Sequence, residues 1–182
     1  MTHAASATRR ADTGASRSAV VMREPLAIYL NDHLMGATSG SELARRVAKQ
    51  HAQTPAGAAL VRMADEIAQD RAELLRIMDD LGIPVRRYKI GIGWAVEKAG
   101  RAKTNGFLVR RAPLSSLVEL ESLRAGVEAK RLMWQALRAS GTDRTGGLGA
   151  DRLTELLHRA RRQLETLEDL HLQVAGAVLE KS

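Results

Sequence analysis

The sequence predicts an all-α protein, a bundle of four helices in one domain, and two observations carry this prediction. Apolar residues recur at alternating +4 and +3 spacing in four stretches of the chain, which places them on one face of a helix in each stretch. Aromatic residues make up only 3% of the 182 residues, so the core must be built from Leu, Val, Ile, Met and Ala. Because strands are enriched in aromatic and β-branched residues, this composition favours helices.

Residues 1–22 are expected to form a disordered basic tail. They are rich in Ala, Ser, Thr and Arg and show no apolar periodicity, which is typical of segments that bury too little surface to fold. The pair Arg9 and Arg10 is not followed by an apolar run, so it does not mark an export signal. The helical domain is expected to span residues 23–182.

The first helix is predicted to begin near Glu24, with Pro25 in its opening turn, and to end near His51. Gly36 and Gly40 weaken it by about 1 kcal/mol each relative to Ala, a cost that close approach of a neighbouring backbone would offset. Its inner face carries Leu26, Leu30, His33, Ala37, Ser41, Ala44 and Val47 or Ala48.

The second helix is the most sharply delimited, in the stretch from Thr54 to Pro84. Thr54 is a candidate N-cap with Pro55 in the first helical position, and Gly82 can adopt the left-handed conformation that ends a helix. The turn before it is short, so the first two helices must be antiparallel neighbours. Its inner face carries Leu60, Ala64, Ile67, Arg71, Leu74, Met78 and Leu81.

Residues 85–114 are expected to form a long crossover along the outside of the bundle. The segment holds Tyr88, Trp94 and Phe107 together with many basic residues, and it is too long for a hairpin link between adjacent helices.

The third helix is predicted to start at Ser115 or Ser116, after Pro113, because Ser116 and Glu119 have the spacing of a capping box. Lys130 interrupts its apolar face, and we expect it to mark the place where that face opens to solvent. A glycine-rich loop follows, and a fourth helix opens at Asp151. The apolar face of the third helix carries Leu120, Leu123, Val127, Trp134 and Leu137, and that of the fourth carries Leu153, Leu157, Ala160, Leu164, Leu167, His171, Val174 and Val178.

Composition limits the classes of function. The chain has no cysteine, which excludes disulfides, thiolate metal sites and cysteine nucleophiles and suits a reducing, cytoplasmic setting. No apolar run has the length of about 18–20 residues that a membrane span needs. The net charge of +7 permits binding to nucleic acid or an acidic partner, but basic and acidic residues alternate along the helices, as they do on solvated surfaces.

Two antiparallel helix pairs, a long crossover between them and a second helix ending in Leu81-Gly82 resemble the ferritin-like four-helix bundles. This resemblance, over residues 24–179, implies a di-metal site with one Glu from each of two helices and a Glu-x-x-His from each of the other two. Glu42 and Glu128 stand where the single carboxylates are expected.

The rest of that ligand set is missing. In the second helix the stretch Ala68-Gln69-Asp70-Arg71 stands in place of the Glu-x-x-His motif, and in the fourth helix Arg162 and Gln163 line up with Asp70 and Arg71. A Glu-x-x-His does occur from Glu168 to His171, but it lies about one and a half turns beyond the expected site. We therefore expect no bound metal, no cofactor and no catalytic residues.

Arg71 has two possible roles. Its side chain can lie along the core with the guanidinium in water, or Arg71 or Arg162 can enter the bundle and pair with Asp70, Glu42, Glu128 or Glu73. In the second case an ion-pair network replaces the metal, because a buried arginine requires a partner. The polar interior is then expected to comprise Glu42, Asp70, Arg71, Glu128, Arg162, Gln163 and His171.

These expectations lead to a non-catalytic bundle that acts as a structural or protein-interaction module of unknown partner. One alternative is a ferritin-like di-metal protein for iron handling or oxidation, which would use Glu42, Glu128, Glu168 and His171. Another is a nucleic-acid-binding bundle that uses the tail and the crossover, as some bacterial ferritin-like proteins use basic tails. A homo-oligomer is expected to form, in any of these cases, through the small residues of the first helix, Gly36, Ala37, Gly40 and Ala44.

Overall fold

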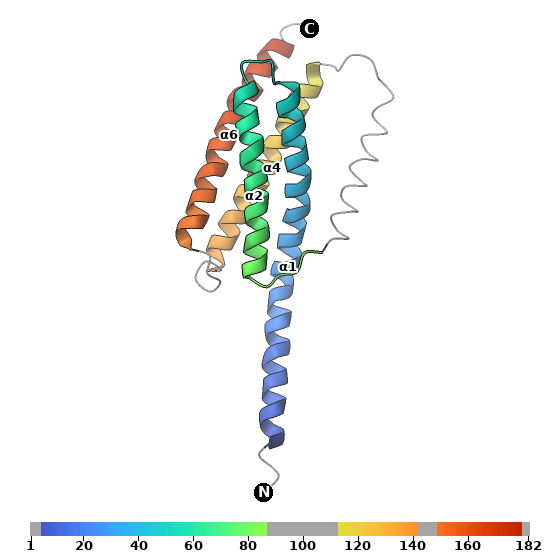
Figure 1. The fold of residues 1–182 in the computed structure, drawn as a ribbon, viewed down its shortest axis with the longest axis vertical. Helices are drawn as coiled ribbons and strands as arrows, with labels where there is room; N and C mark the ends of the chain where they lie inside the picture. Colours follow the sequence, from blue (N-terminus) through green and yellow to red (C-terminus); the bar gives the residue numbers. More distant parts are fainter. Residues whose placement is uncertain (1–4, 87–112, 142–148, 180–182) are drawn as a thin grey trace, which may run out of the picture.

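A computed structural model describes residues 5–86, 113–141 and 149–179 of the chain (Figure 1). Every regular element in these ranges is an α-helix: α1 (Ala5–Gln50), α2 (Gly57–Asp80), α4 (Pro113–Ala139) and α6 (Ala150–Leu179). The prediction of an all-α bundle is therefore confirmed for this part of the chain. The expected crossover falls mostly on residues 87–112, which lie outside the described residues.

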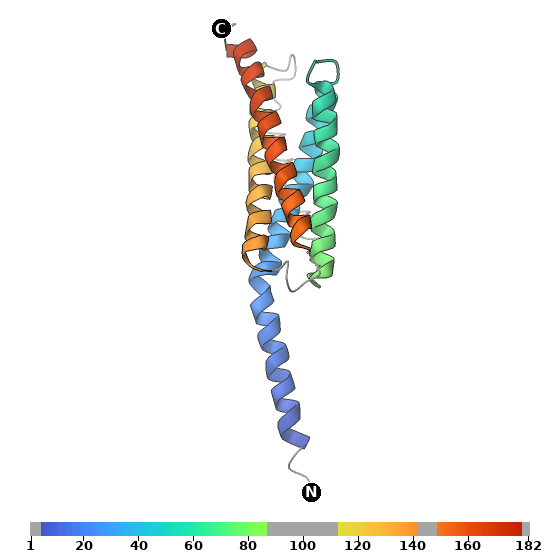
Figure 2. The ribbon, with the colours of Figure 1, turned by 90° about the vertical axis from the view of Figure 1, so that its left-hand side faces the viewer.

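The four helices stand side by side, with α1 and α6 running in one direction and α2 and α4 in the other (Figures 1 and 2). The closest packing is between α4 and α6 and between α1 and α2, with a smaller contact between α1 and α4. Contact between α2 and α6 is the slightest of the four. The end of α2 and the start of α4 lie at opposite ends of the bundle (Figure 1).

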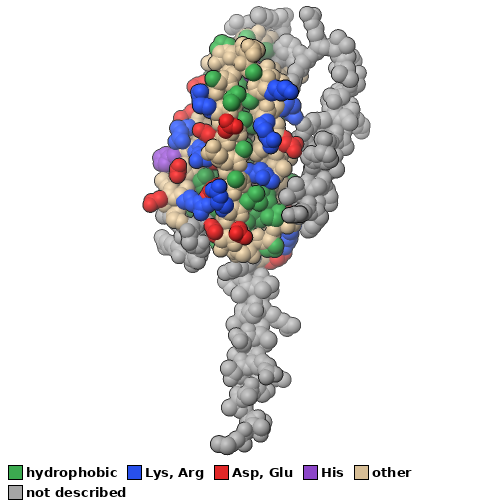
Figure 3. Space-filling view, in the orientation of Figure 1, with side chains coloured by type: hydrophobic (Ala, Val, Ile, Leu, Met, Phe, Trp, Pro, Cys, Tyr) green, Lys and Arg blue, Asp and Glu red, His purple; other side chains and the backbone are tan. Residues whose placement is uncertain are grey.

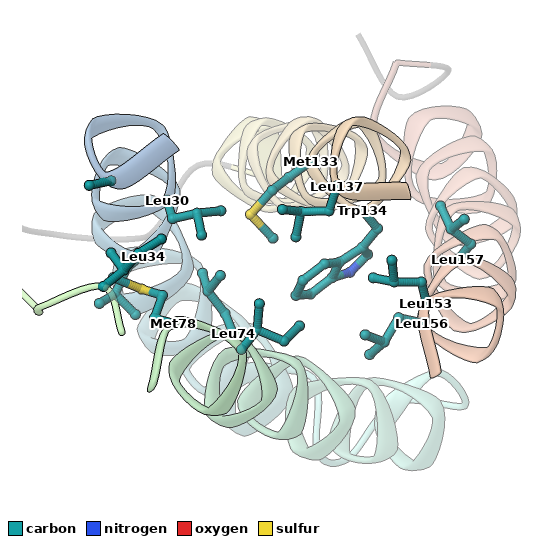
Figure 4. Close-up of a cluster of buried hydrophobic side chains, with 13 residues drawn as sticks. Leu30, Leu34, Leu74, Met78, Met133, Trp134, Leu137, Leu153, Leu156 and Leu157 are labelled. Carbon is teal, nitrogen blue, oxygen red and sulfur yellow. The ribbon is translucent and has the colours of Figure 1, made fainter. Parts of the chain in front are cut away.

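Two groups of buried apolar side chains fill the interior. One, at the end where α2 finishes, includes Leu30, Leu74, Met78, Trp134 and Leu153 (Figure 4). The other lies toward the opposite end and includes Val47, Leu60, Leu123, Val127 and Leu167. Every apolar residue predicted for the inner face of the third helix is buried, as expected for the 3.6-residue period of a helix that covers a core.

The helices begin at residues other than those predicted. Helix α1 begins at Ala5, so the predicted start near Glu24 is wrong, and residues 5–22, expected as a disordered tail, form a helical extension that projects from the bundle (Figure 2). The high helix propensity of Ala and Arg favours this extension although Pro25 removes one backbone donor.

Thr54 is not the N-cap of α2. Its hydroxyl donates to the carbonyl of His51 at 2.7 Å, and the N-cap position belongs to Ala56, which makes no side-chain capping bond. The hydroxyl therefore closes the turn between the helices. Helix α2 thus begins two residues later than predicted, at Gly57, whereas α4 and α6 begin slightly earlier than predicted, at Pro113 and Ala150.

The C-terminus of α2 agrees with the prediction. Gly82 has a φ of 65°, its N–H donates to Asp79, and the N–H of Ile83 donates to Met78, both at 2.8 Å. This pair of bonds is a Schellman motif, and it turns Ile83 back into the core. The buried side chain of Asn31 then holds the outgoing chain, donating to the carbonyl of Pro84 at 3.1 Å and accepting from the N–H of Arg86 at 2.7 Å.

Among the described residues, none of the helices is both long enough and apolar enough to span a bilayer.

Candidate functional site: a buried charge network

Asp70 is the centre of the polar interior. It projects from α2 and is only 1% exposed. The ammonium of Lys130, from α4, donates to one of its carboxylate oxygens at 2.5 Å, and the guanidinium of Arg159, from α6, donates to the other at 3.0 Å. Three helices thus meet at one carboxylate, which carries a cation on each oxygen.

Gln163 extends this cluster along α6. Its side-chain carbonyl accepts a second hydrogen bond from Lys130 at 2.6 Å, and its amide donates to Glu66 at 2.8 Å. Gln163 is only 2% exposed, so its side chain makes these hydrogen bonds inside the protein rather than with solvent. We call Asp70, Lys130, Arg159, Gln163 and Glu66 the Asp70 network; its two cations and two carboxylates balance.

A second group of charges lies one turn further along α2. Glu73 pairs with Arg152 of α6 and with Arg76, the latter at 2.6 Å. Arg152 also reaches Asp80 at 3.5 Å. Long charged side chains therefore bridge α2 and α6, whose contact is otherwise slight. The two cavities on this side, of about 390 and 180 Å³, are lined mainly by such polar residues.

Lys130 occupies an unfavourable place for a charge. Burial lowers the pKa of Lys130, and the charge and hydrogen bond of Asp70 offset only part of this effect. An unpaired ammonium at this position would be strongly destabilising, so the pair with Asp70 is required for Lys130 to remain charged.

We expect the stability contributed by Lys130 to rise with pH in the alkaline range. Its pKa is lower in the folded chain than the ordinary 10.5, so between these two values the unfolded state binds more protons and the free energy of unfolding increases with pH. Urea unfolding at a series of pH values up to about 10.5 should show the wild type gaining stability relative to Lys130→Met, which lacks this titration. A constant difference between the two proteins would contradict the lowered pKa.

The structure distributes the seven residues expected in the polar interior over different environments. Asp70 and Gln163 are buried in the network. Arg71, Glu128 and His171 are half-buried, whereas Glu42 and Arg162 are exposed. The prediction that Glu42 and Arg162 face the interior is therefore wrong: on their helices the neighbouring Ser41 and Gln163 point inward instead.

The remaining three make separate contacts. Glu128 pairs with Arg131 on its own helix at 2.6 Å, and hydrogen bonds from Arg131 lower the pKa of Glu128. His171 lies 3.1 Å from Glu121 of α4. The Nε of Arg71 donates to the hydroxyl of Thr38 at 3.0 Å, and Arg71 pairs with no carboxylate of the described residues.

The inward cation predicted for the bundle exists, but it is a different residue. Lys130, expected to mark an opening to solvent, has a side chain only 12% exposed, and Arg159 is not among the residues predicted for the polar interior. Lys130 follows Val127 by three residues and precedes Trp134 by four, so it lies on the same helix face as these two apolar residues. This regular spacing was a signal that Lys130 is buried. Nothing in the pattern of α6 singles out Arg159, because its position depends on how α6 faces α2.

Within the described ranges, no group of three or more His, Asp or Glu side chains is placed to hold a metal ion. Comparisons of the chain with protein-family models, with curated proteins and with solved structures gave no match. The proposed function therefore rests on this geometry.

Proposed function

We propose that this chain is a non-catalytic helical bundle of ferritin-like architecture that binds no metal and acts as a structural or protein-interaction module in the cytosol. The observation that carries the proposal is the pairing of Asp70 with both Lys130 and Arg159. Asp70 is the carboxylate on α2 nearest to the place where the resemblance puts a metal ligand.

The charges around Asp70 oppose a bound metal. Two unit charges about 4 Å apart interact by about 4 kcal/mol at an effective dielectric constant near 20. A divalent ion carries two charges, so Lys130 and Arg159 would each repel an ion bound at Asp70 by about twice this energy. It would also have to displace hydrogen bonds of 2.5 and 3.0 Å that already satisfy the carboxylate.

The helix directions support the ferritin-like architecture. Helices α2 and α4 run the same way, and the end of one lies far from the start of the other (Figure 1). A connection across the length of the bundle is what the ferritin-like topology requires between its second and third helices.

The surface supports protein contacts more than binding to nucleic acid. Basic and acidic side chains are interspersed on the face shown in Figure 3, rather than gathered by sign, and phosphate binding favours a continuous basic patch. Two helices carry exposed apolar side chains on one face. On α6 these are Leu172 and Leu179, seven residues apart, and on α4 they are Val118 and Leu132, fourteen residues apart. Such side chains are available to contact a partner protein.

The metal content of the purified chain tests the proposal. We expect far less than one iron, manganese or zinc ion per chain by elemental analysis, even after incubation with iron(II), and no oxidation of iron(II) above the buffer rate. Light scattering on the same sample gives the mass in solution. About two metal ions per chain, lost in the variant Glu168→Gln/His171→Asn, would instead support the di-metal alternative.

A nucleic-acid titration distinguishes the remaining alternative. Tight binding of duplex DNA that weakens steeply as salt rises would contradict the proposal, because that dependence marks contacts to phosphates.

A further inference from the structure

A third cavity lies on the other side of the interior, between α1, α2 and α4. It measures about 110 Å³ and its walls are largely apolar, formed by side chains such as Ile67, Leu74, Val127 and Met133. Figure 4 shows Leu74 of α2 and Met133 and Trp134 of α4 converging in this part of the core. The cavity is distinct from the two polar ones between α2 and α6.

Three glycines within helices line this cavity: Gly36 and Gly40 on α1 and Gly126 on α4. Each destabilises its helix by about 1 kcal/mol relative to Ala. The compensation expected for Gly36 and Gly40, close approach of a neighbouring backbone, is wrong among the described residues, because a Cβ at either position would meet none of their atoms within 4 Å, and the same holds for Gly126. The missing side chains therefore leave open space, and the small residues Ala37, Ser122 and Ala129 widen it.

The charges that line the cavity favour an anion. Asp70 and Lys130 neutralise each other at its inner side. Burial lowers the pKa of His33, with a smaller opposing effect of Asp32, so His33 is neutral at pH 7. Arg71 remains, half-buried, and it pairs with no carboxylate among the residues that the structure describes; its one hydrogen bond there goes from Nε to Thr38. The lining thus carries one positive charge that no carboxylate of the described residues neutralises.

We propose that this cavity binds a small monocarboxylate with a compact apolar body, whose carboxylate pairs with Arg71 and whose hydrocarbon part lies between Ile67, Leu74 and Met133. An apolar cavity of about 150 Å³ accommodates benzene, so a volume of about 110 Å³ suits a branched or linear group of roughly four carbons. A planar guanidinium is well suited to a carboxylate because two of its N–H groups can donate in parallel.

Isovalerate is a suitable probe, with the uncharged isovaleramide as its shape-matched control. In an amide NMR titration of the full chain, we expect saturable shifts with isovalerate at residues of the cavity, and binding of isovaleramide weaker by about tenfold or more. That ratio corresponds to the loss of one charge-assisted hydrogen bond. Equal affinity for the two probes, or no saturable shift with either, overturns the proposal.

Two pairs of variants locate the site. Arg71→Met should weaken isovalerate binding by about tenfold or more, while Arg62→Met, an exposed arginine of the same helix, should not change it. Gly126→Leu should abolish binding by filling open space, while Gly176→Leu on α6, which also has open space around it but does not line the cavity, should bind as the wild type does.

The leucine variants also report on folding. Both should melt at or above the wild-type temperature, because each replaces a helix glycine without a clash. Retained binding in Gly126→Leu overturns the proposal. So does a wild-type dimer that becomes monomeric in Gly126→Leu, since the cavity would then be part of an interface between two copies of the chain.

Discussion

Replacing Asp70 by Asn should lower the free energy of unfolding by about 3–5 kcal/mol, the typical cost of removing one partner from a buried ion pair. The cost is large because the change leaves two cations, Lys130 and Arg159, without their shared carboxylate. Urea unfolding followed by circular dichroism measures it. Since folded domains are stable by only about 5–15 kcal/mol, the variant would be close to the limit of folding at 37 °C.

Lys130→Met should cost less than Asp70→Asn, because Asp70 then keeps Arg159. Asp65→Asn is the matched control, an exposed aspartate on the same helix, and it should change stability by no more than about 0.5 kcal/mol. If Asp70→Asn were as silent as this control, the Asp70 network would not stabilise the bundle. A double-mutant cycle of Asp70→Asn with Lys130→Met measures their coupling directly.

Trp134→Ala is the second change with a large expected effect, a loss of about 3–5 kcal/mol. Trp134 is fully buried and packs among side chains of α2 and α6 in the middle of one apolar cluster (Figure 4). Removing the indole would open a cavity beside Leu74 and Leu153, and the cost of a large-to-small change in a core grows with the cavity that it leaves. The urea midpoint should fall sharply, whereas Leu132→Ala, at an exposed position of the same helix, should leave it nearly unchanged.

Trp134→Phe separates the packing of the ring from its polar atom. The indole N–H of Trp134 is buried and has no hydrogen-bond partner among the described residues, a state that costs about 1–3 kcal/mol. Phe removes that N–H together with part of the ring, so the two effects oppose each other and the net loss should be well below that of Trp134→Ala. Equal losses in the two variants would contradict this expectation, because they would show that the ring that Phe keeps contributes nothing to stability here.

The local spacing of apolar residues was sufficient to predict the helices and most of the core. The four apolar faces depend only on the 3.6-residue period within each helix, and the end of α2 depends on Gly82 and Ile83, a few residues from the helix itself. The starts of the helices were less predictable. Thr54 had the right chemistry for an N-cap, yet its hydroxyl found an acceptor in the preceding turn.

The long-range polar contacts were not predictable in the same way. Asn31 lies on the inner side of α1, and only the fold shows that it holds Pro84 and Arg86, more than fifty residues away. Gly36 and Gly40 were expected to be offset by close approach of a neighbouring backbone, but the described residues make no such contact. The space beside them depends on the distance between α1 and α4.

The sequence by itself determined that this chain forms four amphipathic helices, where the second one stops, and that charged residues interrupt the inner faces. Only the tertiary structure decided which charges are buried: Lys130 and Arg159 meet Asp70, while Arg71 turns to Thr38 and Arg162 stays in solvent. The physical reason is that helix formation depends on neighbours within about one turn. The choice of an ion-pair partner depends instead on the rotation and spacing of separate helices, which no pattern within a single helix records.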